Sequence, residues 1–295
     1  MGAAGEIPDR VARQVAGVLG VEPGSLRTAG LSGGCINPAA RVQSEADVVF
    51  VKWATAHTPP DQFEREADAL RLIEAARAVR VPRVHAVSSD ALVLEWIEPG
   101  RVAGKSWAEL GSALARLHRN TAPAFGASKD NYIGPLPQRN GWLDGWVEFY
   151  RERRVRPQLE RALAAAAFDT SERHLLARFV DSLDTILADA APGGASLLHG
   201  DLWSGNAHPS AHGDVVLLDP ASYHGDREVD LAMAELFGGF PRAFYDAYEE
   251  AWPTPAGSSR RRSAYRVYYL LVHVNLFGAG YVRGTMDAVR ASLHG

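Results

Sequence analysis

The residue types best suited to chemistry stand after two short apolar runs. Asp201 and Asn206 lie five positions apart directly after the first run, and Asp219 ends the second. Phosphoryl transfer from ATP needs such a set: one carboxylate orients and deprotonates the attacking hydroxyl, while another carboxylate and an amide oxygen hold Mg²⁺ against the phosphates. The spacing matches the kinase pattern H-R-D-L-x-x-x-N, with Gly200 in place of its arginine. Asp and Asn are also common in turns, so it is the second aspartate that favours the phosphoryl-transfer hypothesis.

A lysine inside an apolar, strand-like run is the next candidate. Only three of the 31 basic residues are lysines, and Lys52 is the one in such a run. A lysine there either faces solvent beside buried neighbours or contacts a phosphate. Glu66, 14 positions later on a predicted helix, could pair with the ammonium and direct it at the phosphates of ATP; Glu64 is the alternative partner.

A glycine-rich turn precedes the lysine strand and contains Ser32, Gly33, Gly34, Cys35 and Asn37. Paired glycines allow backbone N–H groups to approach phosphates, although an ordinary hairpin turn has the same composition. Cys35 is the only cysteine, which excludes an internal disulfide framework and favours a reducing compartment. Two interpretations of Cys35 stay open: a small residue suited to a tight turn, or a thiol whose oxidation suppresses activity or links two chains.

The order of predicted elements suggests how these residues are brought together. A β-rich first part is followed by a Pro-Gly hinge and a mainly helical remainder, and the N-terminus forms a surface helix. Ser106 and Glu109 match a capping box at the start of the first helix after the hinge. Strands are predicted at 27–31, 39–43, 48–53 and 91–97, with helices at 61–77, 143–166, 171–188 and within 229–295.

Composition limits the class of protein. The chain has 295 residues, is 46% hydrophobic and carries a net charge of −4. These values are typical of a globular protein and disfavour nucleic acid as a partner, which usually requires a basic face. There is no secretory or membrane-spanning segment, so we expect a soluble, cytoplasmic protein. The basic triplet 260–262 is predicted to lie in a solvated surface loop.

With these motifs in place, the chain resembles the fructosamine-3-kinase (ketosamine-3-kinase) family of the protein-kinase-like superfamily, which also contains aminoglycoside and choline phosphotransferases. The resemblance covers nearly the whole chain, and the Trp-Ser-Gly between Asp201 and Asn206 is its most specific part. The matching segments are 32–37, 50–52, 63–70, 94–95, 110–119, 131–134, 138–146, 198–206, 219–223, 225–233 and 236–241.

The resemblance implies an α+β, bilobal kinase-like fold with an ATP- and Mg²⁺-dependent activity. Residues 1–97 would form a small N-terminal lobe, an antiparallel sheet with one helix, and residues 98–295 a mainly helical C-terminal lobe. Asp201 would be the proton acceptor, and Asn206 and Asp219 would bind Mg²⁺. Lys52, paired with Glu66, would hold the α- and β-phosphates beneath the turn that runs from Ser32 to Asn37. The hinge backbone at Glu95, Trp96 and Ile97 would bind the adenine edge.

The implied reaction is phosphorylation of the sugar 3-hydroxyl of a ketosamine, free or protein-bound, which repairs early glycation. Trp203 would be a stacking platform for the sugar or a buried support for the loop, with neither favoured. Asp226, Glu228 and Asp230 would cap helices or anchor the loop after Asp219 rather than bind a substrate amine. The alternatives are an aminoglycoside- or choline-type phosphotransferase and an ATP-binding pseudokinase. Neither a nucleic acid nor a membrane is expected as a partner, and the sequence leaves open the preferred ketosamine and the oligomeric state.

Overall fold

Side chains of the N-terminal lobe alternate between two buried faces of one sheet. The computed structural model describes residues 7–31 and 37–294. In β3 (Val48–Trp53), Val49 and Val51 pack into one apolar cluster and Phe50 packs against another. Because successive side chains of a strand point to opposite faces, Lys52 shares the face of Phe50. The valine-rich strand is thus buried on both sides, and its single charge is directed to the face that Phe50 occupies.

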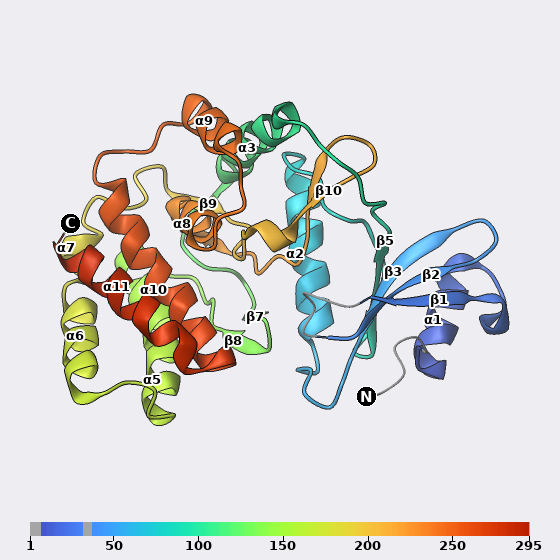
Figure 1. Ribbon diagram of the computed structural model, residues 1–295, viewed down its shortest axis with the longest axis horizontal. Helices are drawn as coiled ribbons and strands as arrows, with labels where there is room; N and C mark the ends of the chain where they lie inside the picture. The colour runs from blue at the N-terminus through green and yellow to red at the C-terminus, as the bar shows by residue number, and fades with distance from the viewer. Residues whose placement is uncertain (1–6, 32–36, 295) are drawn as a thin grey trace.

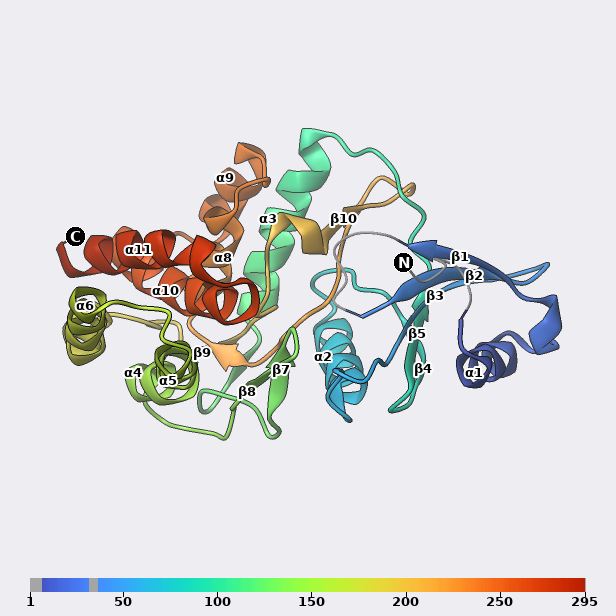
Figure 2. The ribbon, with the colours of Figure 1, turned by 60° about the horizontal axis from the view of Figure 1, so that its bottom comes forward.

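The sheet has five antiparallel strands in the order β1-β2-β3-β5-β4. Helix α1 (Asp9–Leu19) packs Val11 and Val15 into the cluster on one face. Helix α2 (Gln62–Ala76) covers the other face (Figures 1 and 2). The remaining strands are β1 (Arg27–Leu31), β2 (Ala39–Gln43), β4 (Val84–Val87) and β5 (Ala91–Glu95).

Helices dominate the chain after Glu95 (Figure 1), and most of them contribute to a third apolar cluster. The 20-residue helix α10 (Ser258–Phe277) runs through its centre. The other helices are α3 (Gly104–His118), α4 (Trp146–Phe149), α5 (Arg156–Ala164), α6 (Thr170–Asp181), α7 (Leu183–Ile186), α8 (Glu228–Leu236), α9 (Arg242–Ala251) and α11 (Val282–His294).

Short strands in this part of the chain carry the segments that matter for the site. They form two hairpins, β7–β8 and β10–β11, and a three-stranded sheet β12-β9-β6. Their bounds are β6 (Thr121–Ala122), β7 (Asn131–Ile133), β8 (Leu136–Gln138), β9 (Ala195–Leu197), β10 (Ala207–Pro209), β11 (Val215–Leu217) and β12 (His224–Gly225).

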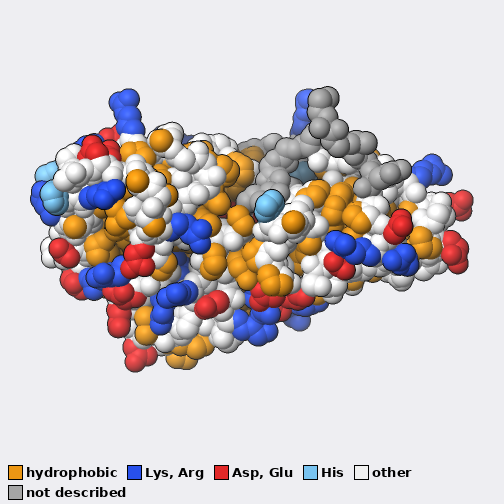
Figure 3. Space-filling model, turned by 90° about the horizontal axis from the view of Figure 1, so that it is seen from below, with side chains coloured by type: hydrophobic (Ala, Val, Ile, Leu, Met, Phe, Trp, Pro, Cys, Tyr) orange, Lys and Arg blue, Asp and Glu red, His pale blue; other side chains and the backbone are white. Residues whose placement is uncertain are grey.

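The expected α+β, bilobal kinase-like fold is therefore confirmed, with a small antiparallel sheet followed by a mainly helical part. The placement of the lobe boundary at residue 97 stays a prediction. No helix in the described residues is long and apolar enough to cross a membrane. On the face seen in Figure 3, acidic and basic side chains lie interspersed rather than in a block of one sign.

Two local expectations are wrong. Ser106 does not cap α3, because the helix already begins at Gly104 and the Ser106 hydroxyl donates to the carbonyl of Gly213, 2.6 Å away. A capping box does form at Asp169 and Glu172, at the start of α6. The continuous helix expected at 143–166 is interrupted by a π-helical stretch, Tyr150–Val155, between α4 and α5.

Candidate active site

Lys52 is buried on the sheet face that α2 covers. Its Nζ lies 2.5 Å from Glu66 Oε1, and 5% of the residue is exposed. Glu66 reaches it because Phe63 and Leu70, on the same side of α2, pack against the sheet. The other two lysines, Lys105 and Lys129, have side chains 86% and 63% exposed. Glu66, rather than Glu64, is therefore the ion-pair partner of the buried ammonium.

Asp219 joins this pair from the other lobe, with its Oδ1 2.9 Å from Lys52 Nζ. Burial alone would lower the pKa of Lys52, but the charges of Asp219 and Glu66 outweigh it and hold that pKa above its usual value. Burial raises the pKa of Glu66 to about 7, against the opposing charge of Lys52. Burial would raise the pKa of Asp219, but the charge and hydrogen bond of Lys52, together with His199 and Glu66, outweigh burial and hold that pKa below its usual value.

Two backbone positions fix the loop around Asp201. Gly200 has φ +86°, and a Cβ there would lie 2.2 Å from the carbonyl oxygen of Ala221. No side chain fits between these two backbones, which explains why this chain has glycine where the kinase pattern has arginine. Asp219 itself has φ +52°, a conformation that costs energy for a residue with a Cβ. The loop that carries Asp201 and the segment after Asp219 are thus packed directly against each other.

The fully buried carboxylate of Asp230, on α8, holds this loop. It accepts hydrogen bonds from the backbone N–H groups of His199 (2.7 Å) and Gly200 (2.9 Å) and lies 3.1 Å from Nε2 of His118. Burial would raise its pKa, but these contacts outweigh burial and hold the pKa of Asp230 below its usual value. Asp230 is therefore an ionised anchor for the loop that carries Asp201.

Replacing Asp230 by alanine is expected to lower the free energy of unfolding by about 3–5 kcal/mol, because three buried donors lose their acceptor. Urea unfolding of the wild type and the variant measures this loss. Asp246→Ala, at a carboxylate on α9 whose side chain is 63% exposed, is the matched control and should change stability little. Equal stability of Asp230→Ala and the wild type would remove Asp230 as an anchor.

His199 supports the loop in a neutral form. Its Nε2 donates to the carbonyl of Leu218 (2.9 Å), and its Nδ1 accepts from the backbone N–H of Asp201 (3.3 Å). Burial lowers the pKa of His199, which keeps the ring uncharged. Both ring nitrogens are engaged, so His199 acts as a structural residue and not as a base.

Asp201 and Asn206 lie in contact. The Asn206 amide nitrogen donates to the Asp201 backbone carbonyl (2.9 Å) and approaches the carboxylate Oδ2 at 3.3 Å. Burial raises the pKa of Asp201 to about 7, and the charge of Asp219 adds to the effect. A carboxylate whose pKa lies near neutrality is suited to accept a proton from an alcohol.

The donor set around Asn206 fits Mg²⁺. With the amide nitrogen turned to Asp201, the amide oxygen is left to act as a ligand, and the Asp219 side chain is 38% exposed. Both are hard oxygen donors. Among residues 7–31 and 37–294, no group of three or more His, Cys, Asp or Glu side chains could hold a metal. Mg²⁺ commonly binds through one or two protein ligands together with substrate phosphates, which is the arrangement that this pair could support.

Two hollows meet at these residues. A hollow of 370 Å³ is lined mostly by apolar groups, and a neighbouring hollow of 190 Å³ contains Lys52, Glu66 and Asp201. Asn206, Asp219 and Trp203 line both. The apolar hollow is lined by Leu31, Phe50, Pro82, Leu94, Glu95, Trp96, Ile97, Pro99, Gly205, His208 and Leu218 in addition to the three shared residues. A flat apolar group bound in the apolar hollow and a hydroxyl bound beside Asp201 in the polar hollow would therefore both lie next to the shared polar residues, Asn206 and Asp219.

The predicted hinge residues line the apolar hollow. The backbone N–H of Glu95 donates to the carbonyl of Arg83 (2.8 Å), and its side chain pairs with Arg80 (2.8 Å). Trp96 and Ile97 follow directly, and both line the hollow. Any donation from the hinge to an adenine edge would therefore come from the residues after Glu95.

Only part of the glycine-rich turn is described. The predictions for Ser32, Gly33, Gly34 and Cys35 lie outside the described residues, and with them both interpretations of Cys35. Asn37 is buried, lines the polar hollow and accepts a hydrogen bond from Thr58 (2.6 Å). Its amide oxygen is thus held by the loop before α2.

Trp203 combines features of both predicted roles. It lines both hollows and also packs against the large apolar cluster of the C-terminal part. Its ring lies over Gly205, where a Cβ would come within 2.2 Å of ring carbon Cη2. The Trp-Ser-Gly sequence is therefore a physical unit, because the ring can fold back over the loop only when the residue two positions later has no side chain.

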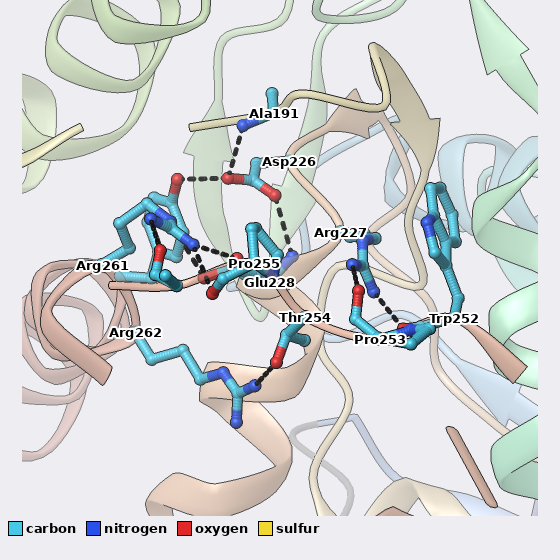
Figure 4. A network of polar contacts seen from close by, with 12 residues as sticks. Ala191, Asp226, Arg227, Glu228, Trp252, Pro253, Thr254, Pro255, Arg261 and Arg262 are labelled. Atoms are coloured by element: carbon cyan, nitrogen blue, oxygen red, sulfur yellow. Dashed lines mark hydrogen bonds and ion pairs between the residues drawn. The ribbon is translucent and has the colours of Figure 1, made fainter. Parts of the chain in front are cut away.

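A buried polar network lies behind the site (Figure 4). It bears on two further predictions from the sequence, the roles of Asp226 and Glu228 and the solvated loop at 260–262. Asp226 accepts from the backbone N–H of Ala191 and from the Tyr265 hydroxyl, and Glu228 pairs with Arg261 at 2.7 Å. Asp226 and Glu228 are thus internal anchors. The prediction of a solvated loop at 260–262 is wrong: Arg261 is 3% exposed, because Glu228, 33 positions away, neutralises it within the fold.

The β7–β8 hairpin was not predicted to contribute. The carboxamide of Asn131 donates to the carbonyl of Ser222 (3.0 Å), and that of Gln138 to the carbonyl of Ala221 (3.1 Å) and to Asn131 (2.8 Å). Both side chains are buried beside the segment that follows Asp219. In the sequence these residues stand only within two segments of the family resemblance, 131–134 and 138–146, which do not reveal the backbone carbonyls that they meet.

Comparisons with known proteins agree with this geometry. The family model described as "Fructosamine kinase" matches residues 9–294. A "Probable ketoamine kinase" of Synechocystis sp. is 41% identical over 268 residues, covering 89% of each chain. A chloroplastic "Protein-ribulosamine 3-kinase" of Arabidopsis thaliana is 36% identical over 269 residues, covering 88% of this chain and 80% of its own.

A solved structure matches over almost the full length. It is the crystal structure of a "putative fructosamine-3-kinase" from Thermobifida fusca, with a TM-score of 0.88 and 33% sequence identity, and the match covers 98% of this chain and 100% of that one. The family model and the relatives above 30% identity each span more than four fifths of the chain. The chain therefore belongs to the fructosamine kinase family.

Proposed function

We propose that this protein is an ATP- and Mg²⁺-dependent kinase that phosphorylates the sugar 3-hydroxyl of ketosamines. The observation that carries the proposal is the junction of the two hollows at Asn206 and Asp219, with Asp201 and Lys52 on the polar side. Family membership supports the nucleotide, and the names of the relatives, ketoamine kinase and ribulosamine 3-kinase, support the acceptor.

Each polar residue has a distinct part in this reaction. Asp201 orients the acceptor hydroxyl and takes its proton, for which its raised pKa is suited. Lys52, held by Glu66, binds the α- and β-phosphates. Asn206 and Asp219 would hold Mg²⁺, which when bound neutralises charge on the phosphates. The protein contributes mainly by positioning and by fixed charge, because phosphoryl transfer requires little covalent help.

The sugar would lie in the polar hollow beside Asp201. Trp203 lines that hollow, and the apolar face of a sugar would pack on its aromatic ring. The adenine would occupy the apolar hollow, against Phe50, Leu94 and the hinge residues Trp96 and Ile97. Phosphate at the 3-position makes the sugar–amine linkage unstable, so the reaction would release the amine and repair early glycation.

An acceptor panel tests the proposal. The protein is incubated with MgATP and fructosyl-lysine, ribulosyl-lysine, an aminoglycoside or choline, and ADP release is measured. We expect turnover with the ketosamines alone, and NMR of the product should show phosphate on O3. Transfer only to the aminoglycoside or to choline would assign a different acceptor. ATP binding without transfer to any member of the panel would favour a pseudokinase.

A further inference from the structure

Helix α2, which carries Glu66, is attached to the C-terminal part of the chain near its first turn. The hydroxyl of Tyr132, on β7, donates to Asp61 Oδ1 (2.6 Å), and the Gln62 side chain donates to the carbonyl of Gly134 (3.1 Å). Figures 1 and 2 both show α2 between the sheet and the β7–β8 hairpin. The hairpin is therefore the neighbour that faces α2 across the site.

The geometry of β7 explains why Tyr132 reaches the helix. Asn131 and Ile133 are buried, whereas Tyr132 between them is partly exposed, as expected for neighbours on opposite faces of a strand. The inward carboxamide of Asn131 and that of Gln138 hold the backbone of residues 221–222. One face of the hairpin is thus tied to the segment after Asp219, and the other presents a hydroxyl to α2.

The contact is made one turn away from Glu66. Asp61 immediately precedes α2, and its second carboxylate oxygen accepts from Arg65 Nε (3.1 Å). Residues four apart lie on the same side of a helix, so fixing Asp61 and Gln62 also fixes the side from which Glu66 reaches Lys52. A helix is rigid over one turn, and a rotation or tilt that broke the contact at Asp61 would carry Glu66 with it.

We propose that Tyr132 is a positioning residue: through Asp61 it fixes α2 against the C-terminal part of the chain and so keeps Glu66 on Lys52. The inference rests on the proposed function only in taking a nucleotide as the ligand of Lys52. It makes nucleotide affinity depend on a hydroxyl that donates to Asp61 and not to Lys52, Glu66, Asn206 or Asp219.

The protonation states of Tyr132 and Asp61 favour their hydrogen bond at neutral pH. Burial and the hydrogen bond to Asp61 raise the pKa of Tyr132 to about 12, so the phenol keeps its proton. The same hydrogen bond holds the pKa of Asp61 below its usual value, so the acceptor is ionised. Arg65 and Asp130 are the other charged groups acting on Tyr132, and their effects on its pKa oppose each other.

Tyr132 also lines the polar hollow, so a direct contact with the sugar is the competing role. The two roles predict different measurements. Loss of a positioning residue lowers the fraction of molecules whose Glu66 and Lys52 are ready for nucleotide, which raises the nucleotide Kd. Loss of a sugar contact raises the ketosamine KM and leaves the nucleotide Kd unchanged.

The test is Tyr132→Phe, with MgADP binding measured by calorimetry and ketosamine KM by steady-state kinetics. We expect the MgADP Kd to rise about fivefold, as for loss of one hydrogen bond of ordinary net strength, with ketosamine KM within about twofold of the wild type. Tyr150→Phe is the matched control: it removes a hydroxyl that donates to the Ala264 carbonyl (2.8 Å) in the C-terminal core, and its Kd should be that of the wild type.

A double-mutant cycle with Asp61→Ala isolates the contact. Tyr132→Phe should add nothing to the rise in Kd that Asp61→Ala produces alone. An unchanged MgADP Kd in Tyr132→Phe, additive effects in the cycle, or a rise in ketosamine KM alone would each overturn the proposal. The binding arm does not require ketosamine turnover, so failure of the proposed acceptor and failure of the positioning role are separate results.

Discussion

Replacing Asp201 by alanine is expected to lower kcat for ketosamine phosphorylation by about 10²- to 10⁴-fold while MgADP still binds. Within the described part of the chain, Asp201 is the carboxylate of the polar hollow that forms no ion pair, and its pKa is raised to about 7 by burial and by the charge of Asp219. Removing it takes away the group that orients the acceptor hydroxyl and accepts its proton. Single-turnover kinetics with saturating MgATP measure the loss directly.

Asp201→Asn provides the control for shape. It keeps the volume and can still meet the Asn206 amide, which lies 3.3 Å from the present carboxylate, but it cannot accept a proton as a base. We expect it to be nearly as inactive as the alanine variant, with a MgADP Kd close to that of the wild type. A kcat within tenfold of the wild type in either variant would end the assignment of Asp201 as proton acceptor.

The second large effect is expected at Lys52. Lys52→Met replaces the ammonium by an apolar chain of similar length and should raise the KM for ATP between about 10- and 100-fold, through loss of charged contacts to the phosphates. The substitution has a second consequence: Glu66 and Asp219 lose the cation between them. Loss of stability must therefore be separated from loss of binding.

The double variant Lys52→Met/Glu66→Gln makes that separation. It removes the cation and one of its two partners, so it should recover most of the unfolding free energy lost in Lys52→Met while ATP use stays impaired. Lys105→Met, at a side chain 86% exposed, should leave both quantities unchanged. If the double variant regained the wild-type KM for ATP, Lys52 would have only a structural role.

The two ion pairs of Lys52 and the contacts of the β7–β8 hairpin both join the two halves of the site in this structure. Lys52 already bridges Glu66 on α2 and Asp219 after β11, and the hairpin bridges α2 and residues 221–222 by an independent route. Both routes connect the N-terminal sheet to the loop region that carries the proposed metal ligands. Nucleotide binding would therefore need little rearrangement of these elements.

Local pattern predicted four of the five strands of the N-terminal sheet, the helix α2, and Glu66 as one of two candidate partners of Lys52. In β3 and β5 alternate residues face different buried clusters, and the 3–4 residue spacing of α2 places Glu66 on the side of Phe63 and Leu70. These features depend on neighbours within a few positions, which a single sequence contains.

Features that depend on distant backbone could not be predicted. Ser106 bonds the carbonyl of Gly213, and Arg261 is neutralised by Glu228; neither partner leaves a mark near the residue concerned. The same holds for Tyr132 and Gln138, whose roles come from the packing of the hairpin against α2 and residues 221–222. The roles assigned to the individual site residues stay predictions until they are measured.

The central claim is that Asn206 and Asp219 hold one metal ion on one nucleotide beside Asp201. A crystal structure with Mn²⁺ in place of Mg²⁺ and a non-hydrolysable ATP analogue tests it most directly, because Mn²⁺ can be located by its anomalous scattering. The account predicts an anomalous peak within coordination distance of the Asn206 amide oxygen and an Asp219 carboxylate oxygen, with the adenine in the apolar hollow. A nucleotide bound with its metal away from both residues would contradict it.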